Sequence, residues 1–188
     1  MLNLPNFLTL IRIVTVPVFL VFLSSSLYLE ALVVLILAGL TDALDGAVAR
    51  ITGQQTPLGT YLDPVADKLL VMSSFVTLGL IGSLPSWLVV LVLTRDVIII
   101  LGYGMIYFLL GERLEVQPSF IGKINTTLQL LTVGFVLLFL YDAALLPARL
   151  REFLIIATAV TTAVSGFQYI YRGLVWLQNR TPSLPLLS

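Results

Sequence analysis

The sequence contains no cysteine and no histidine among its 188 residues, and only 11% of the residues are charged. Without cysteine the chain has no disulfide, no thiol nucleophile and no thiolate metal ligand. Without histidine, a general base that works near neutral pH has to be a carboxylate, a lysine or a water molecule on a metal ion. Ten basic residues balance ten acidic ones and no basic run occurs, which argues against a nucleic-acid partner.

Hydrophobic residues make up 59% of the chain, and the mean hydropathy is +1.05. This composition is typical of an integral membrane protein rather than of a soluble domain. We therefore expect an all-α integral membrane protein, in which residues 1–180 form one membrane domain and residues 181–188 a disordered tail. No cleavable signal is expected before the first apolar run. Six transmembrane helices are predicted at about 8–28, 30–51, 58–81, 86–110, 120–141 and 153–177.

Six spans place both termini on one side of the membrane, and the positive-inside rule assigns that side to the cytoplasm. This orientation leaves only Arg149 and Arg151 outside. The cytoplasmic side then receives Arg12, Arg50, Lys68, Arg113, Lys123, Arg172 and Arg180. We expect a protein of the bacterial plasma membrane with cytoplasmic termini and an active site at the cytoplasmic side.

Four aspartates stand within the second and third apolar runs, at Asp42, Asp45, Asp63 and Asp67. On helices, spacings of three and four put each pair on one face, so both pairs are expected to point into one pocket. An aspartate at the centre of a spanning helix costs about 2.5 to 3.5 kcal/mol, which predicts cations among the carboxylates. Two Mg²⁺ or Mn²⁺ ions would suit these oxygen ligands and leave positions for substrate phosphates. The alternative is that the aspartates are solvated and structural.

These residues also form a recognisable motif, D-x2-D-G-x2-A-R-x8-G-x3-D-x3-D, which is met without a departure. It resembles the motif of the CDP-alcohol phosphotransferases, a family whose members release CMP as an acceptor hydroxyl attacks a CDP-activated donor. The resemblance implies a homodimer, Asp42, Asp45 and Asp63 as metal ligands, and Asp67 as the general base at the edge of the metal site. The implied CDP-binding residues are Asp42, Gly46, Ala49, Arg50 and Gly59, with Thr56 as a further candidate.

The second half of the chain bears on the acceptor. Residues 122–129 read GKINTTLQ, which resembles the S-K-x-N-T-x-x-Q stretch of mitochondrial-type cardiolipin synthases. Bacterial phosphatidylglycerophosphate synthases usually carry a lysine at the position of Asn125. The resemblance therefore favours phosphatidylglycerol as acceptor and CDP-diacylglycerol as donor, with glycerol 3-phosphate as the alternative acceptor. The expected acceptor-binding residues are Arg95, Arg113, Lys123 and Asn125.

Charge favours the same acceptor. Glycerol 3-phosphate is a dianionic monoester that calls for several charge-assisted contacts, whereas phosphatidylglycerol is a monoanionic diester. A chain with only two lysines suits the less charged molecule.

Arg95 and Asp96 interrupt the fourth apolar run. Neighbouring helical residues point about 100° apart, so the two side chains are not expected to share one small pocket. We predict that Arg95 faces inward and that Asp96 pairs with a neighbouring cation; a purely structural ion pair between helices is the alternative. A divalent-cation transporter would also use intramembrane aspartates, but it would be expected to carry polar groups toward both faces, whereas the first three runs concentrate theirs near one.

Overall fold

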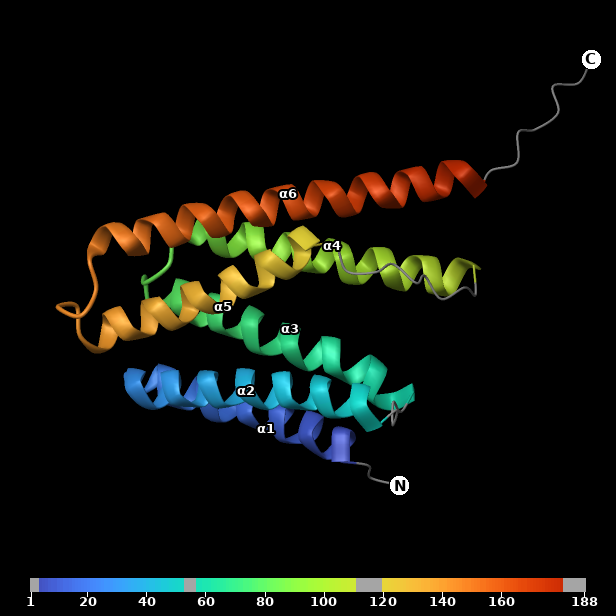
Figure 1. The fold of residues 1–188 in the computed structure, drawn as a ribbon. Helices are drawn as coiled ribbons and strands as arrows, with labels where there is room; N and C mark the ends of the chain where they lie inside the picture. The colour runs from blue at the N-terminus through green and yellow to red at the C-terminus, as the bar shows by residue number, and fades with distance from the viewer. Residues whose placement is uncertain (1–3, 53–56, 111–119, 181–188) are drawn as a thin grey trace, which may run out of the picture.

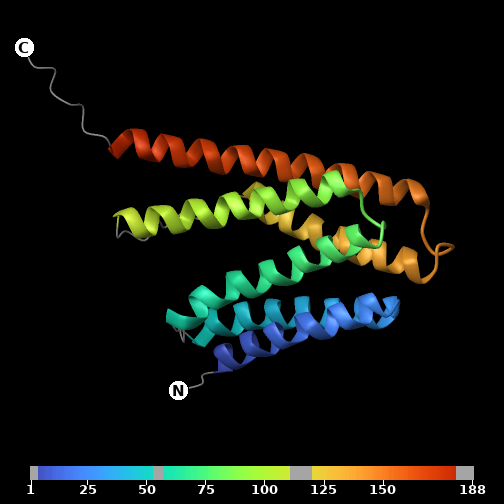
Figure 2. The ribbon, with the colours of Figure 1, turned by 180° about the vertical axis from the view of Figure 1, so that it is seen from behind.

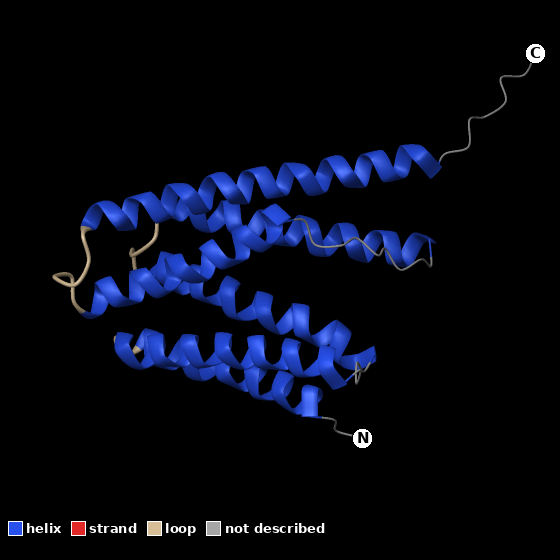
Figure 3. Cartoon of the chain, viewed as in Figure 1, coloured by secondary structure: helices blue, strands red, loops and turns tan. Residues whose placement is uncertain are grey.

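The computed structural model describes residues 4–52, 57–110 and 120–180, and its regular structure in these ranges is entirely helical (Figures 1 and 3). Side chains are described for residues 14–41, 68–102, 120–175 and 178. The helices are α1 (Leu4–Ser24), α2 (Tyr28–Thr52), α3 (Pro57–Leu80), α4 (Ser86–Leu110), α5 (Phe120–Tyr141) and α6 (Ala148–Arg180). The all-α prediction is confirmed for these ranges, and α4 and α5 have the predicted bounds.

Consecutive helices run in opposite directions, so the bundle has two ends (Figures 1 and 2). The turns after α1, α3 and α5 lie at one end, which we call the turn end. The start of α1 and the end of α6 lie at the other, which we call the terminal end. There α2 ends beside the start of α3, whereas α5 begins well short of the end of α4 (Figures 1 and 2).

Helix α3 packs against three other helices. It contacts α1, α4 and α5, while α6 packs against α4 and α5, and α2 packs against α1 and α5. Gly79 allows α3 to approach α4 closely, because a Cβ atom at this position would lie 2.8 Å from Cγ2 of Val89. The buried apolar cluster is richest near the turn end, where its largest fully buried side chains are Phe19, Leu23, Phe75, Leu78, Leu88 and Leu137.

Many large apolar side chains are exposed on the outer surface, and several polar side chains are buried between the helices. Leu80 is 82% exposed and Phe120 is 77% exposed, whereas Asp96, Asn125 and Gln129 are 0% exposed. Apolar surface outside and polar groups inside are typical of a bundle surrounded by lipid. Within the described ranges, residues 120–141 and 148–175 are long and apolar enough to cross a membrane, and shorter apolar segments lie in α1, α2 and α3.

Arg151 links the start of α6 to the turn between α3 and α4. Its Nη2 donates to the carbonyl oxygen of Ser83 in the α3–α4 turn, and its Cζ lies 5.4 Å from the ring centre of Phe139. We expect Arg151→Met to lose both interactions and to lower the free energy of unfolding by about 1–3 kcal/mol. Thermal unfolding in detergent measures this. Arg149→Met is the matched control because Arg149 is exposed, and equal unfolding temperatures for the two variants would contradict the assignment.

Candidate functional site

The four motif aspartates lie on helix segments that meet at the terminal end. Asp42 and Asp45 belong to the last turns of α2, Asp63 and Asp67 belong to the first half of α3, and only residues 53–56 separate the two helices. The two helix ends are adjacent in both ribbon views (Figures 1 and 2). This arrangement of the backbone is what a shared carboxylate pocket requires.

The side chains of the motif itself lie outside the described set. This applies to the four aspartates and to Gly46, Ala49, Arg50 and Gly59 on α2 and α3, of which the structure describes the backbone. Thr56 and Arg113 lie outside the described residues altogether. Their predicted roles in metal, donor and acceptor binding therefore stay predictions.

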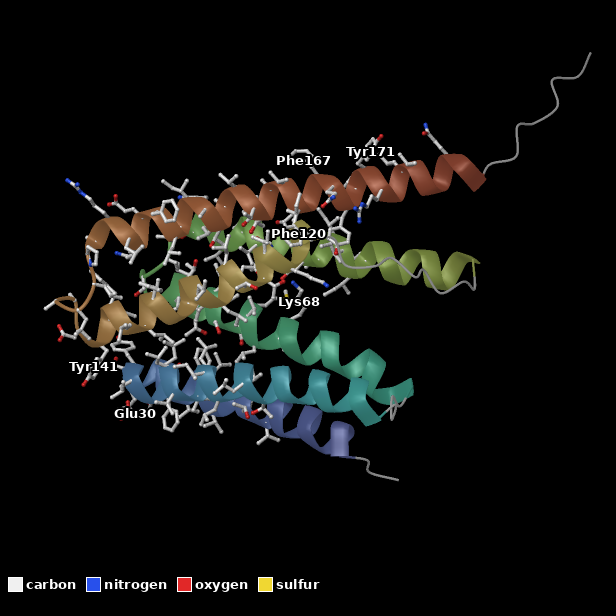
Figure 4. All side chains as sticks on the ribbon, in the orientation of Figure 1. Glu30, Lys68, Phe120, Tyr141, Phe167 and Tyr171 are labelled. Atoms are coloured by element: carbon white, nitrogen blue, oxygen red, sulfur yellow. The ribbon has the colours of Figure 1, made fainter. Side chains whose placement is uncertain are left out.

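Lys68 is the first described side chain after Asp67, and it joins α3 to α4. Its Nζ lies 2.7 Å from Oδ1 of Asp96, with side-chain exposures of 22% for the lysine and 0% for the aspartate. In Figure 4 Lys68 lies on the side of α3 that faces α4 and α5. The predicted pairing of Asp96 with a neighbouring cation is confirmed.

Arg95 bridges α4 and α6. Its Nη1 donates to Oδ1 of Asp96 at 2.6 Å, and its Nη2 donates to Oγ of Ser165 at 2.6 Å. Its Cζ lies 5.4 Å from the ring centre of Tyr169, and its side-chain stem passes Gly166, where a Cβ atom would be 3.4 Å from Cγ of Arg95. These contacts fix both the direction and the plane of the guanidinium.

The predicted inward orientation of Arg95 is confirmed, because this residue is 5% exposed. The expectation that Arg95 and Asp96 would not share one small pocket was wrong. The Cα–Cβ bonds of the two residues diverge, but the long arginine side chain turns back far enough for Nη1 to reach the neighbouring carboxylate. Helical direction alone does not separate side chains of such unequal length.

Asn125 connects α5 to α6. It is 0% exposed, and its Oδ1 accepts hydrogen bonds from the hydroxyls of Thr161 at 3.0 Å and Thr162 at 2.8 Å. Closer to the turn end, the hydroxyls of Thr132 and Thr158 lie 2.7 Å apart. The seam between α5 and α6 is therefore held by hydroxyl and amide groups as well as by apolar packing.

Several buried polar atoms of this region have no hydrogen-bond partner among the described residues. Buried polar atoms without partners are uncommon in proteins, and they cluster where a ligand or water binds. Five of them come from α4 and α5. They are Nε of Arg95, Oδ2 of Asp96, Nδ2 of Asn125, and both Nε2 and Oε1 of Gln129.

Two of the predicted acceptor residues, Arg95 on α4 and Asn125 on α5, thus contact the same segment of α6, residues 161–169. Lys123 lies near the start of α5 and is exposed, whereas Arg95 and Asn125 are buried. Sequence analysis missed Lys68 as the partner of Asp96, and it missed the residues of α6. A signal for the latter was present, because Thr161, Ser165 and Tyr169 recur every four residues and so share one helix face.

Comparison with known proteins identifies the family of this chain. The family model described as CDP-alcohol phosphatidyltransferase matches residues 2–164. The chain belongs to the CDP-alcohol phosphatidyltransferase family. It is therefore an enzyme of the phosphatidyltransferase type, and the family is generally dependent on divalent metal ions.

Relatives of this CDP-alcohol phosphatidyltransferase carry two kinds of name. A probable phosphatidylglycerophosphate synthase of Mycobacterium tuberculosis is 35% identical over 92% of this chain and 82% of its own length. The CDP-diacylglycerol–glycerol-3-phosphate 3-phosphatidyltransferase of Bacillus subtilis is 29% identical over 92% of this chain and 96% of its own length. The CMP-forming cardiolipin synthase of Homo sapiens is 33% identical over 91% of this chain and 62% of its own length. The relatives are thus named both for the transfer to glycerol 3-phosphate and for the synthesis of cardiolipin.

Proposed function

We propose that this phosphatidyltransferase is a cardiolipin synthase, which joins CDP-diacylglycerol to phosphatidylglycerol and releases CMP. The observation that carries the choice of acceptor is the environment of Asn125. Its Oδ1 accepts two hydroxyl hydrogen bonds in a fully buried place. A lysine has donors only, so both hydroxyls would have to turn from donating to accepting, and an additional ammonium group would be buried between α5 and α6.

The charges around Asn125 indicate which acceptor the site suits. Among the described residues of this cluster Arg95 supplies the guanidinium, and its Nε, which has no partner among them, is the donor that we assign to a phosphate oxygen. With a neutral amide at position 125, the described part of the site is matched to a monoanionic phosphodiester. Arg113 and Lys123 are proposed as further acceptor contacts toward the terminal end.

The metal site is proposed at Asp42, Asp45, Asp63 and Asp67. Carboxylate oxygens are the ligands that Mg²⁺ and Mn²⁺ prefer. The end of α2 lies beside the start of α3, so this set of donors fits two such ions. When bound, the ions supply neutralisation of the diphosphate and of the charge that develops on the leaving phosphate.

The residues of the chain then have distinct proposed tasks. Gly46, Ala49, Arg50 and Gly59 line the CDP site together with Asp42, and Thr56 adds a contact; the small residues allow the nucleotide to approach the backbone. Asp67 accepts the proton of the acceptor hydroxyl as its oxygen attacks the phosphorus bonded to diacylglycerol. The bond from that phosphorus to the oxygen of CMP breaks, and CMP leaves.

Membrane insertion is proposed for all six helices. The apolar outer faces of α1 to α6 support it, because exposed large hydrophobic side chains occur on every helix. We place the terminal end, with its basic residues, at the cytoplasmic side of a bacterial plasma membrane. A homodimer is also proposed, since glycine- and alanine-rich helix faces favour close association of helices.

The second candidate is phosphatidylglycerophosphate synthase with glycerol 3-phosphate as acceptor. It is favoured by the names of the Mycobacterium and Bacillus relatives. The presence of two cationic side chains, Lys68 and Arg95, around one carboxylate also suits a small anionic acceptor.

Offering the purified protein CDP-diacylglycerol and Mg²⁺ with each acceptor in turn distinguishes the candidates. Release of CMP with phosphatidylglycerol and not with glycerol 3-phosphate is the expected result. Release of CMP with glycerol 3-phosphate alone would establish the second candidate.

The role of position 125 is tested by Asn125→Lys. We expect the ratio of kcat/KM for phosphatidylglycerol to that for glycerol 3-phosphate to fall roughly tenfold or more, which corresponds to about 1.4 kcal/mol of discrimination. The physical reason is that the added ammonium favours the dianionic acceptor over the monoanionic diester. Thr127→Lys is the matched control, because Thr127 is exposed on the same helix. An unchanged ratio in Asn125→Lys would remove this residue from acceptor selection.

A further inference from the structure

The ion pairs of Asp96 use only one of its two carboxylate oxygens. A single oxygen, Oδ1, receives both Nζ of Lys68 at 2.7 Å and Nη1 of Arg95 at 2.6 Å. The other oxygen, Oδ2, is buried and has no partner among the described residues. The carboxylate itself is 0% exposed. Two cations from different helices are thus held at one atom.

We propose that Asp96 is a positioning residue that sets the place of the Arg95 guanidinium for the acceptor phosphate. The proposal rests on the proposed function only in assigning Arg95 to the acceptor. Asp96 also ties this arginine to Lys68, the residue next to Asp67. It thereby fixes the distance between the helix that carries the proposed base and the group that holds the acceptor.

The contacts of Arg95 show why a positioning residue is needed. An arginine has several rotatable bonds, and burial alone does not select one conformation. Asp96 holds Nη1, Ser165 holds Nη2, and Tyr169 lies against the guanidinium, so the group is constrained from three sides. Of these three, only Asp96 carries a charge, so its hydrogen bond with Nη1 is also an ion pair.

Polar atoms of Arg95, Asp96 and Asn125 remain without a hydrogen-bond partner among the described residues. Nε of Arg95 has no partner among the described residues, and the same holds for Oδ2 of Asp96 and Nδ2 of Asn125. An ion pair that served only to hold two helices together would be expected to satisfy both carboxylate oxygens, because a buried polar atom without a partner costs stability. Two of these atoms, Nε of Arg95 and Oδ2 of Asp96, belong to the ion pair itself, where we expect the acceptor headgroup to bind.

The test is steady-state kinetics of Asp96→Asn, which keeps the shape of the side chain and removes its charge. We expect the KM for the acceptor to rise roughly tenfold or more, as is typical when the partner of a binding group is removed, while the KM for CDP-diacylglycerol changes less than about twofold. If Asp96→Asn does not yield folded protein, Asp96→Glu, which keeps the charge and displaces it by one methylene, is expected to show the same split between the two KM values.

A double-mutant cycle with Arg95→Gln separates positioning from a general structural role. If Asp96 acts through Arg95, adding Asp96→Asn to Arg95→Gln is expected to change the KM for the acceptor less than about twofold. The proposal would be overturned if Asp96→Asn raised the KM for the acceptor by the same factor with and without Arg95→Gln. Equal rises of the KM values for acceptor and donor would also overturn it. Thr132→Val is the control for loss of a buried hydrogen bond, and it is expected to lower the unfolding temperature without changing either KM.

The kinetics are measured with whichever acceptor the wild-type protein uses. Wild-type protein that uses glycerol 3-phosphate instead of phosphatidylglycerol would refute the proposed function, while the KM split and the double-mutant cycle would still decide the role of Asp96. Conversely, cardiolipin synthesis with an unchanged acceptor KM in Asp96→Asn would refute the positioning role alone.

Discussion

Asp67→Asn is expected to abolish turnover while leaving most of the binding of CDP-diacylglycerol in place. Asparagine keeps the size and one oxygen of the side chain, so a position at the edge of the metal site is largely preserved. It does not accept the proton of the attacking hydroxyl, and loss of a general base typically lowers kcat by roughly 10²–10⁴-fold. CMP release measures turnover, and equilibrium binding of the donor measures the retained affinity.

Asp142→Asn is the matched control for this substitution. Asp142 is exposed at the turn end, where its Oδ1 accepts a hydrogen bond from the backbone nitrogen of Ala144 at 2.9 Å. The same chemical change at this distance from the motif is expected to leave turnover unchanged. Loss of metal and donor binding in Asp67→Asn would contradict the role of Asp67 as a base and make it primarily a metal ligand.

Asp45→Ala is expected to have the other large effect, of a different kind. As a proposed metal ligand, Asp45 contributes to neutralising the diphosphate, and metal ions supply several kcal/mol of charge stabilisation in such reactions. Turnover is therefore expected to fall by roughly 10²–10³-fold or more, with the concentration of Mg²⁺ or Mn²⁺ needed for half-maximal activity raised. Titration of the purified variant with each ion measures this shift.

Glu30→Ala is the control for Asp45→Ala, because Glu30 is an exposed carboxylate in the first turn of the same helix. It is expected to keep the activity and the metal dependence of the wild-type protein. An Asp45→Ala enzyme with wild-type metal dependence would exclude Asp45 from the metal site. Together, the two aspartate variants separate proton transfer from metal binding within one motif.

Much of the fold was predictable from the sequence because the apolar runs are long and their interruptions are clear. Proline or glycine beside polar residues marks most breaks, and α4 and α5 begin and end at the predicted residues. The main differences are α1, which extends from Leu4 to Ser24 instead of from about residue 8 to 28, and α6, which extends from Ala148 to Arg180 instead of from about residue 153 to 177. Its additional turns carry Arg149, Arg151 and Glu152, and hydropathy alone does not distinguish a polar helix end from a loop.

The site was predictable to a smaller extent. Residue spacing located the aspartates on α2 and α3, and hydropathy singled out Arg95 and Asp96 as polar residues in an apolar run. The partner Lys68 was not predictable, because its pairing depends on how α3 packs against α4. The hydroxyls of Thr161 and Thr162, which donate to Asn125, were missed for the same reason. They lie on α6, some 36 residues further along the chain.

The central claim is that the phosphatidyl group of CDP-diacylglycerol is transferred to phosphatidylglycerol. The most direct measurement supplies vesicles containing the purified protein with unlabelled CDP-diacylglycerol, deuterated phosphatidylglycerol and Mg²⁺, and follows the products by mass spectrometry. The expected result is cardiolipin in which one of the two phosphatidyl groups is labelled, with one CMP released for each cardiolipin formed. Doubly labelled cardiolipin formed without CMP, or no cardiolipin together with phosphatidylglycerophosphate once glycerol 3-phosphate is added, would contradict the account.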